Sequence, residues 1–161
     1  MIYRPPSEMD YPGMQALDLE LARLENANFD SLSQKDRTAA LRTSLPALLF
    51  YARSEHSFVA IDASSQSETQ PSTVYGFILA QSVWMGDKAF VWVSSIRVHP
   101  DAPPGCLPGL LHCVTKSAFD GAVYELHLLA DSHLDVIATR EGYKDTKAKH
   151  MVRLLGSRGD S

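Results

Sequence analysis

The sequence predicts an α/β (α+β) fold in which a mixed, mostly antiparallel central sheet is flanked by helices. Two long segments rich in β-branched and aromatic residues, Val74–Met85 and Phe90–Val98, are joined across Gly86-Asp87-Lys88 as in an antiparallel hairpin. Amphipathic segments with apolar residues three and four positions apart precede and follow this hairpin. The predicted order of elements is β-α-α-β-β-β-α-β-α-β. This order contains no internal repeat.

A short strand and an amphipathic helix are predicted at the N-terminus. The strand covers Met1–Arg4 and stops at Pro5, because a proline has no backbone N–H for a sheet ladder. The helix follows from an apolar stripe formed by Met14, Leu17, Leu21 and Leu24. We place the charged residues of this helix largely off the stripe; they are Asp18, Glu20, Arg23 and Glu25.

A second helix and a second strand are predicted before the hairpin. Ser33 and Asp36 have the spacing of a capping box that opens the helix, and Pro46 then breaks or restarts it. The short apolar segment Ser57–Ile61 is predicted as a strand. The Ser-, Gln- and Thr-rich segment Ala63–Thr73 has no periodicity, so it is predicted as an exposed loop.

A loop, a helix and a strand are predicted after the hairpin. The loop is the Pro- and Gly-rich segment Pro100–Pro108, and the helix ends near Gly121. The apolar face of this helix is formed by Leu107, Leu110, Leu111, Val114 and Ala118. Tyr124–Ala130 then supplies a further strand.

The C-terminal part is predicted to hold a short helix and a last strand. Asp131 or Ser132 can cap the helix, and Gly142 is placed to stop it. Met151–Leu155 is predicted as the closing strand. We expect one domain over residues 1–156 and a disordered tail over 157–161, because a chain of 161 residues buries one sizeable core.

Composition and charge exclude several classes of protein. The net charge of −4 gives no sign of the cationic surface that nucleic acid requires. The longest apolar run, Leu45–Ala52, contains Pro46 and is too short to span a bilayer. Since no signal peptide opens the chain, we expect a cytoplasmic protein that has no nucleic-acid or membrane partner and whose two cysteines are reduced.

Two motifs in the second half of the chain resemble those of a known superfamily. Ile96-Arg97-Val98-His99-Pro100 has the alternating aliphatic residues and final proline of a strand that leads into a binding loop. Glu141-Gly142-Tyr143 has a Gly-aromatic step that ends a helix. With the order of elements, these motifs resemble the GNAT superfamily of N-acetyltransferases, which use acetyl-CoA to acylate amines. The resemblance covers nearly the whole chain.

The resemblance implies a site for acetyl-CoA or another acyl-CoA. In the GNAT fold the fourth strand splays from the fifth and pairs with the pantetheine arm; Ile96 and Val98 would carry those main-chain groups here. The following loop and helix start would present N–H groups to the pyrophosphate. Because the prolines of this segment have no backbone N–H, the remaining N–H donors are those of Gly105, Cys106, Leu107 and Gly109.

The chain departs from the family pattern where the chemistry is done. The loop lacks the Arg or Gln with which the family opens it. The family's acid is often a Tyr four residues before the Gly of the Gly-aromatic step, and this position is Ala138. The catalytic residues are therefore unknown. His99, at the end of the predicted fourth strand, is a candidate base, and the alternative is a polar residue at a strand end.

Two further side chains have two interpretations each, and one cluster suggests a metal. Tyr124 is either a displaced acid or a packing residue with a solvated hydroxyl. Cys106 is either a reactive thiol at a helix N-terminus or a small loop residue. Cys106 and Cys113, with His112 and His127, lack the close pairings typical of zinc sites, so we expect no metal.

Two functions remain open from the sequence. The first is a GNAT-like acyl-CoA-binding protein, an N-acetyltransferase for a small amine or a protein amine. The second is a non-catalytic binding or regulatory module that kept the GNAT fold and lost acetyl-CoA chemistry. The aromatic residues of the hairpin serve either as core or as a homodimer interface.

Overall fold

The structure, a computed structural model, describes residues 1–65, 69, 72–131 and 133–155. The chain divides into two compact units, Met1–Leu129 and Ala130–Ser161. The single domain over residues 1–156 stays a prediction, and the tail 157–161 lies outside the described residues. In the described part, each helix is too short or too polar to cross a membrane.

The first unit holds a five-stranded mixed sheet with the order β1-β2-β3-β4-β5. The first four strands pair antiparallel and β5 pairs parallel to β4. The strands are β1 (Ile2–Arg4), β2 (Phe58–Ile61), β3 (Val74–Met85), β4 (Lys88–Val98) and β5 (Leu126–Leu128). The predicted strand over Tyr124–Ala130 is thus shorter than expected, because only residues 126–128 pair with β4.

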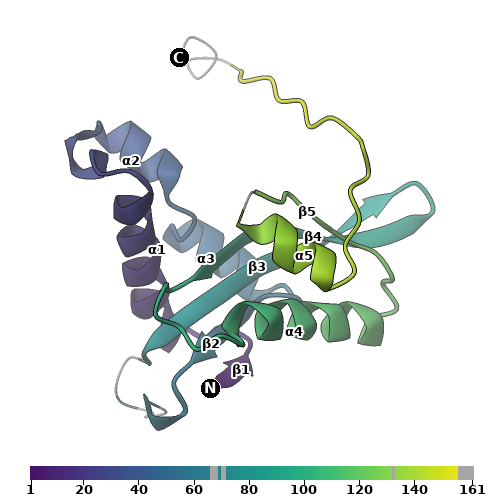
Figure 1. Ribbon diagram of the computed structural model, residues 1–161, viewed down its shortest axis with the longest axis horizontal. Coiled ribbons are helices and arrows are strands. Elements are labelled where there is room, and N and C mark those ends of the chain that lie inside the picture. Colours follow the sequence, from purple (N-terminus) through teal and green to yellow (C-terminus); the bar gives the residue numbers. More distant parts are fainter. Residues whose placement is uncertain (66–68, 70–71, 132, 156–161) are drawn as a thin grey trace. The chain divides into compact units, whose positions relative to one another are not determined.

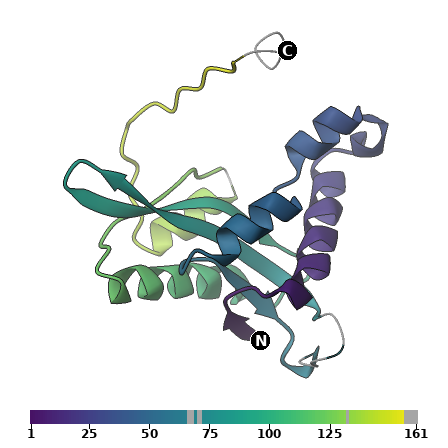
Figure 2. The ribbon, with the colours of Figure 1, turned by 180° about the vertical axis from the view of Figure 1, so that it is seen from behind.

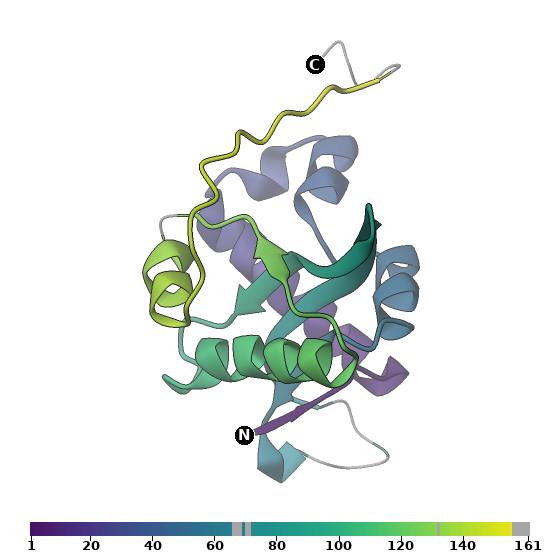
Figure 3. The ribbon, with the colours of Figure 1, turned by 90° about the vertical axis from the view of Figure 1, so that its right-hand side faces the viewer.

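Helices cover both faces of this sheet. They are α1 (Tyr11–Glu25), α2 (Gln34–Ala40), α3 (Leu45–Ala52) and α4 (Cys106–Asp120), with short 3-10 turns at Glu8–Asp10, Phe29–Ser31 and Ala63–Ser65. Helix α4 lies on one face (Figure 1), and α1 and α3 lie on the opposite face, which Figure 2 shows from behind. The side view in Figure 3 shows the sheet between these layers. The predicted mixed sheet flanked by helices is confirmed.

Local signals in the sequence place the starts of α2 and α3. The Ser33 Oγ accepts from the N–H of Asp36 over 3.1 Å and donates to the Asp36 Oδ2 over 2.7 Å, so Ser33 caps α2 with one of the two bonds of the predicted capping box. Pro46 lies in the first turn of α3, so it restarts the helical path as a separate helix. The Ser44 Oγ accepts from the N–H of Ala47 there, over 3.4 Å.

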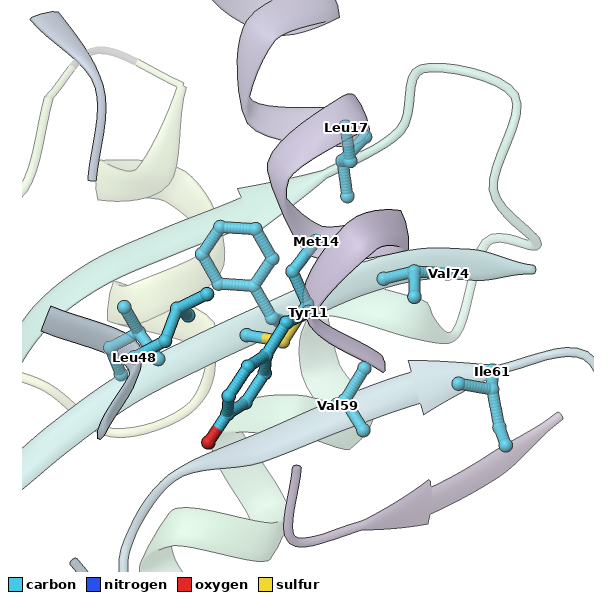
Figure 4. Packing of buried hydrophobic residues seen from close by; sticks show 9 residues of the cluster. Tyr11, Met14, Leu17, Leu48, Val59, Ile61 and Val74 are labelled. Atoms are coloured by element: carbon cyan, nitrogen blue, oxygen red, sulfur yellow. The ribbon is translucent and has the colours of Figure 1, made fainter. Parts of the chain in front are cut away.

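The core on the α1 face joins two helices to the centre of the sheet. Figure 4 shows Tyr11, Met14 and Leu17 of α1 beside Leu48 of α3, over the side chains of β2 and β3. The predicted stripe of α1 is correct for Met14 and Leu17 but wrong at two positions. Leu24 is exposed, whereas Asp18 is fully buried, because residues 14, 17, 18 and 21 share one helical face.

The long hairpin β3–β4 contains a tight turn and a β-bulge. Gly86 has a φ of 68°, a conformation that favours glycine in a two-residue hairpin turn. Further along, Leu79 pairs with Ser95 but Ala80 pairs with Val93. Ser94 is therefore the extra residue of a bulge, which bends β4 at this point.

The second unit begins with the helix α5 (Leu134–Arg140). The Asp131 Oδ1 accepts from the N–H groups of His133 and Leu134, each over 2.9 Å, so Asp131 caps this helix as predicted. Ser132 lies outside the described residues. Gly142, with a φ of 90°, ends the helix, and the following N–H of Tyr143 donates to the Ala138 carbonyl over 2.9 Å.

The predicted closing strand over Met151–Leu155 is wrong. A strand needs a neighbour whose main chain completes its ladder, and this segment joins none of the described strand pairs. Its apolar side chains also stay in solvent, with Met151 87% and Leu155 72% exposed. An apolar-polar pattern of five residues is too weak to predict a strand without its partner.

Candidate functional site

The candidate site is the part of β4 that β5 leaves unpaired, together with the start of α4. The pairing of β4 with β5 covers Val91 to Val93 and ends there. The N–H of His99 donates to the Tyr75 carbonyl of β3 over 2.7 Å. Since main-chain groups alternate in direction along an antiparallel strand, Ile96 and Val98 direct theirs away from β3. Within the first unit, these two residues form an open edge of β4.

The start of α4 offers fewer N–H donors than the sequence predicts. The Cys106 N–H donates to the Pro103 carbonyl, and the Gly109 N–H donates to the Gly105 carbonyl, each over 2.9 Å. The N–H groups of Gly105 and Leu107 find no acceptor among the described residues. Of the four predicted donors, these two therefore remain without a main-chain acceptor at the positive end of the helix.

Packing against Tyr3 explains why a glycine stands at position 109. The Tyr3 hydroxyl of β1 donates to the Gly105 carbonyl over 3.1 Å, and the ring crosses the first turn of α4. A Cβ at Gly109 would lie 2.3 Å from the Tyr3 Oη, which no side chain tolerates without movement. Burial raises the pKa of Tyr3, so its hydroxyl stays protonated. By contrast, a Cβ at Gly105 would meet nothing within 4 Å.

Cys106 is a buried thiol, which argues against its interpretation as a reactive cysteine. Its side chain is buried beneath the first turn of α4, where a Cβ on Gly76 of β3 would lie 3.2 Å from the Sγ. Burial raises the pKa of Cys106 to about 11. The loss of hydration outweighs the attraction of the helix N-terminus for a thiolate, because no solvent reaches the sulfur.

His99 lies at the end of β4 with both ring nitrogens in hydrogen bonds. The Nδ1 accepts from the N–H of Asp101 over 3.0 Å, and the Nε2 lies 3.2 Å from the Glu20 Oε1 of α1. A neutral His99 therefore carries its proton on Nε2 and donates it to Glu20. In this tautomer the ring has no free lone pair with which to take a proton from an amine.

Arg97 is an important residue of β4 that sequence reasoning did not single out. Its Nε donates to the Oδ1 of the buried Asp18 over 3.1 Å, and its Nη1 pairs with Glu25. The other Asp18 oxygen accepts from the Arg42 N–H and the Thr43 hydroxyl, over 2.6 and 2.9 Å. The spacing of Asp18 from Met14 and Leu21 is the sequence signal that could have found this pair.

The remaining predicted candidates lie elsewhere. Tyr124 is exposed, and its ring makes an edge contact with the ring of Phe119, which is exposed as well. The His127 ring stacks obliquely on Phe90, with centroids 4.3 Å apart. Among the described residues, no three His, Cys, Asp or Glu side chains gather as metal ligands. A cavity of about 370 Å³ adjoins the C-terminal half of α4 and is lined by none of the predicted acyl-CoA residues.

A five-stranded mixed sheet with this helix arrangement, opened at β4 beside a helix start, defines a GNAT acyltransferase-like fold. Solved structures agree with this assignment at low sequence identity. A protein described as a predicted acetyltransferase from Clostridium acetobutylicum, solved with acetyl-CoA, is 11% identical with a TM-score of 0.60, over 94% of this chain and 95% of that chain. AAC(6')-Iy, in complex with a CoA bisubstrate analogue, is 13% identical with a TM-score of 0.63, over 96% and 98% of the two chains.

The chain belongs to the family described as "Protein of unknown function (DUF1999)", whose model matches residues 1–161. TTHA1254 from Thermus thermophilus is 32% identical, with a TM-score of 0.70 over 98% of this chain and 100% of that chain. No curated protein matches the chain.

Proposed function

We propose that this chain binds acetyl-CoA or another acyl-CoA along the open edge of β4 and transfers the acyl group to an amine. The observation that carries the proposal is the end of the β4–β5 pairing at Val93, which leaves the main-chain groups of Ile96 and Val98 directed to that edge. The amide groups of a pantetheine arm pair with such an edge as an added strand does.

The start of α4 supports the proposal at the pyrophosphate end. The N–H groups of Gly105 and Leu107 are without a protein acceptor in the described part, and the space beside Gly105 is open. A helix N-terminus favours negative charge, and a pyrophosphate brings several acceptor oxygens. With two donors and no cation in the loop, we expect weak affinity, in the micromolar to millimolar range.

Thermal unfolding with acetyl-CoA tests the binding step. A ligand that binds the native state raises the unfolding midpoint. Once the ligand concentration exceeds Kd, the rise grows with the logarithm of that concentration. We expect a concentration-dependent rise with acetyl-CoA and a smaller one with ADP, which shares only the nucleotide end. Absence of any rise at millimolar acetyl-CoA would overturn the proposal.

A charge variant and its neutral partner locate the site. In Gly105→Glu, a carboxylate enters the open space beside the proposed pyrophosphate position. Gly105 is the N-cap of α4, where a negative charge interacts favourably with the helix dipole, so the fold should persist. We expect at least a tenfold loss of acetyl-CoA affinity in Gly105→Glu and less than a threefold loss in Gly105→Gln.

A second function is the binding of acyl-CoA without acyl transfer. It is favoured because the polar side chains at the end of β4 are already held by other protein groups. Both nitrogens of His99 are in hydrogen bonds, and Arg97 is held by Asp18 and Glu25. Ala138, which corresponds to the family's acid, has no proton to donate. If the chain binds acetyl-CoA but releases no CoA with any amine, this second function is the correct one.

A further inference from the structure

The bulged residue of β4 forms a hydroxyl pair with a side chain from α3. Ser94 is the residue that β3 leaves unpaired between Val93 and Ser95. Its Oγ shares a hydrogen bond with the Tyr51 hydroxyl, and either oxygen can be the donor. Both residues are only partly buried, so neither belongs to the fully enclosed core.

The position of this pair along β4 matches the reacting end of the proposed acyl-CoA site. The start of α4 lies beyond Val98, and it defines the pyrophosphate end of the open edge. A pantetheine arm that runs from there past Val98 and Ile96 reaches the bulge next. At the bulge the open edge closes, because β5 is paired with Val93. The thioester would therefore stop beside Ser94.

Two polar side chains at the end of β4, Arg97 and His99, are unsuited to proton transfer at this end. His99 lies five residues beyond Ser94, roughly 16 Å away at the rise of a β-strand, and its Nε2–H is directed to Glu20. Arg97 has no lone pair to accept a proton and already pairs with Asp18.

We infer that Ser94 and Tyr51 are the proton-relay pair of this acyltransferase, an inference that rests on the proposed function. When the amine nitrogen bonds to the acyl carbon and the C–S bond breaks, the amine loses one proton and the CoA thiolate gains one. The Ser94 Oγ takes the amine proton and passes its own to the Tyr51 oxygen, and Tyr51 gives its proton to sulfur. The pair ends each cycle unchanged, and no other reactant is needed.

Kinetics of Tyr51→Phe and Ser94→Ala test the pair. The assay follows CoA thiol release from acetyl-CoA with spermidine, L-lysine, ethanolamine or a lysine-containing peptide as acceptor. Removing a general acid-base group costs about 10²–10⁴ in rate, so we expect kcat to fall about a hundredfold with KM for acetyl-CoA nearly unchanged. Ser94→Thr keeps a hydroxyl and should restore at least a tenth of the wild-type kcat.

A matched variant and the binding assay separate the outcomes. Tyr124→Phe removes an exposed tyrosine hydroxyl elsewhere in the first unit and should leave kcat unchanged. If Tyr51→Phe and Ser94→Ala transfer at the wild-type rate, the relay is overturned while the proposed function stands. If the wild-type chain binds acetyl-CoA but acylates none of the four amines, the relay is overturned and only the binding site remains. If acetyl-CoA does not bind, the proposed function itself has failed.

Discussion

The Nε of Arg97 in β4 donates over 3.1 Å to the Oδ1 of Asp18 in α1, a carboxylate that is fully buried. This ion pair fixes the end of β4 against the helix that covers it. The second Asp18 oxygen holds the N–H of Arg42 and the hydroxyl of Thr43, so one carboxylate organises three separate segments. A buried carboxylate with this many donors is difficult to replace.

Asp18→Ala should destabilise the chain by about 3–5 kcal/mol, because it leaves the Arg97 guanidinium and two further donors without their acceptor. Chemical denaturation measures the change in the free energy of unfolding. Glu25→Gln is the matched control, since Glu25 meets the same guanidinium from an exposed position and should cost little. Equal effects of the two substitutions would contradict the central role of Asp18.

Gly109→Ala should destabilise the fold by about 1–3 kcal/mol, because the new methyl group would overlap the Tyr3 ring. Gly105→Ala, where the Cβ meets nothing, should be neutral within about 0.5 kcal/mol. Thermal and chemical denaturation compare the two. The double variant Tyr3→Ala/Gly109→Ala should lose less stability than the sum of the single changes. Additive losses would show that Gly109 is not constrained by Tyr3.

Pro108→Ala should tighten acetyl-CoA binding about tenfold. Pro108 is the third residue of α4 and supplies no N–H to the first turn, where an alanine would add one more donor. A hydrogen bond to a charged group is worth about 1.5–3 kcal/mol, and about 1.4 kcal/mol is tenfold in Kd. Isothermal titration measures the change. An unchanged Kd would place the pyrophosphate away from this turn.

His56 should make the chain less stable in mild acid. Ser117 donates to the Glu55 carbonyl over 2.6 Å, so it accepts the His56 Nδ1–H over 2.9 Å, and the Nε2 accepts from Ser82 over 3.0 Å. Burial lowers the pKa of His56 below 6.5 in the folded state, so the unfolded chain takes the proton more readily. This stabilisation is complete above pH 6.5 and is lost as the pH falls through the folded pKa.

The unfolding free energies of the wild-type chain and His56→Gln at pH 7.5 and pH 5.0 measure this contribution. The variant lacks the titrating ring, so its stability should fall less over this interval than that of the wild type. The same decrease in both proteins would assign the pH dependence to other groups.

Cys106 should resist thiol reagents while the chain is folded. Its pKa is raised to about 11 by burial, whereas Cys113 is only partly buried, although burial raises the pKa of that thiol as well. With a disulfide reagent at pH 8, we expect Cys113 to react first and Cys106 to react only on unfolding. Mass spectrometry of the modified peptides distinguishes them. Early labelling of Cys106 would contradict its protection by burial.

The sequence predicts best those parts of the fold that depend on residues close to one another along the chain. The two strands of the hairpin, the Ser33 cap and the Gly142 helix stop follow from side-chain pattern, capping chemistry and backbone freedom. The candidate site was predictable only as a location, from the aliphatic strand that ends in Pro100. The sequence predicted too many free N–H donors at the start of α4. The N–H groups of Cys106 and Gly109 donate to nearby carbonyls, and the residue types do not reveal these bonds.

The sequence by itself determined the fold class and the prolines that remove N–H donors from the start of α4. It also determined the order of the elements up to α5, except that α2 and α3 were predicted as one helix interrupted at Pro46. Only the tertiary structure decided where β5 stops, that Ser94 is bulged toward Tyr51, that Asp18 is buried against Arg97, and that Gly109 accommodates Tyr3. The physical reason is the range of the interactions. Helix caps and turns form within a few residues, whereas strand register, buried ion pairs and close packing join positions distant along the chain.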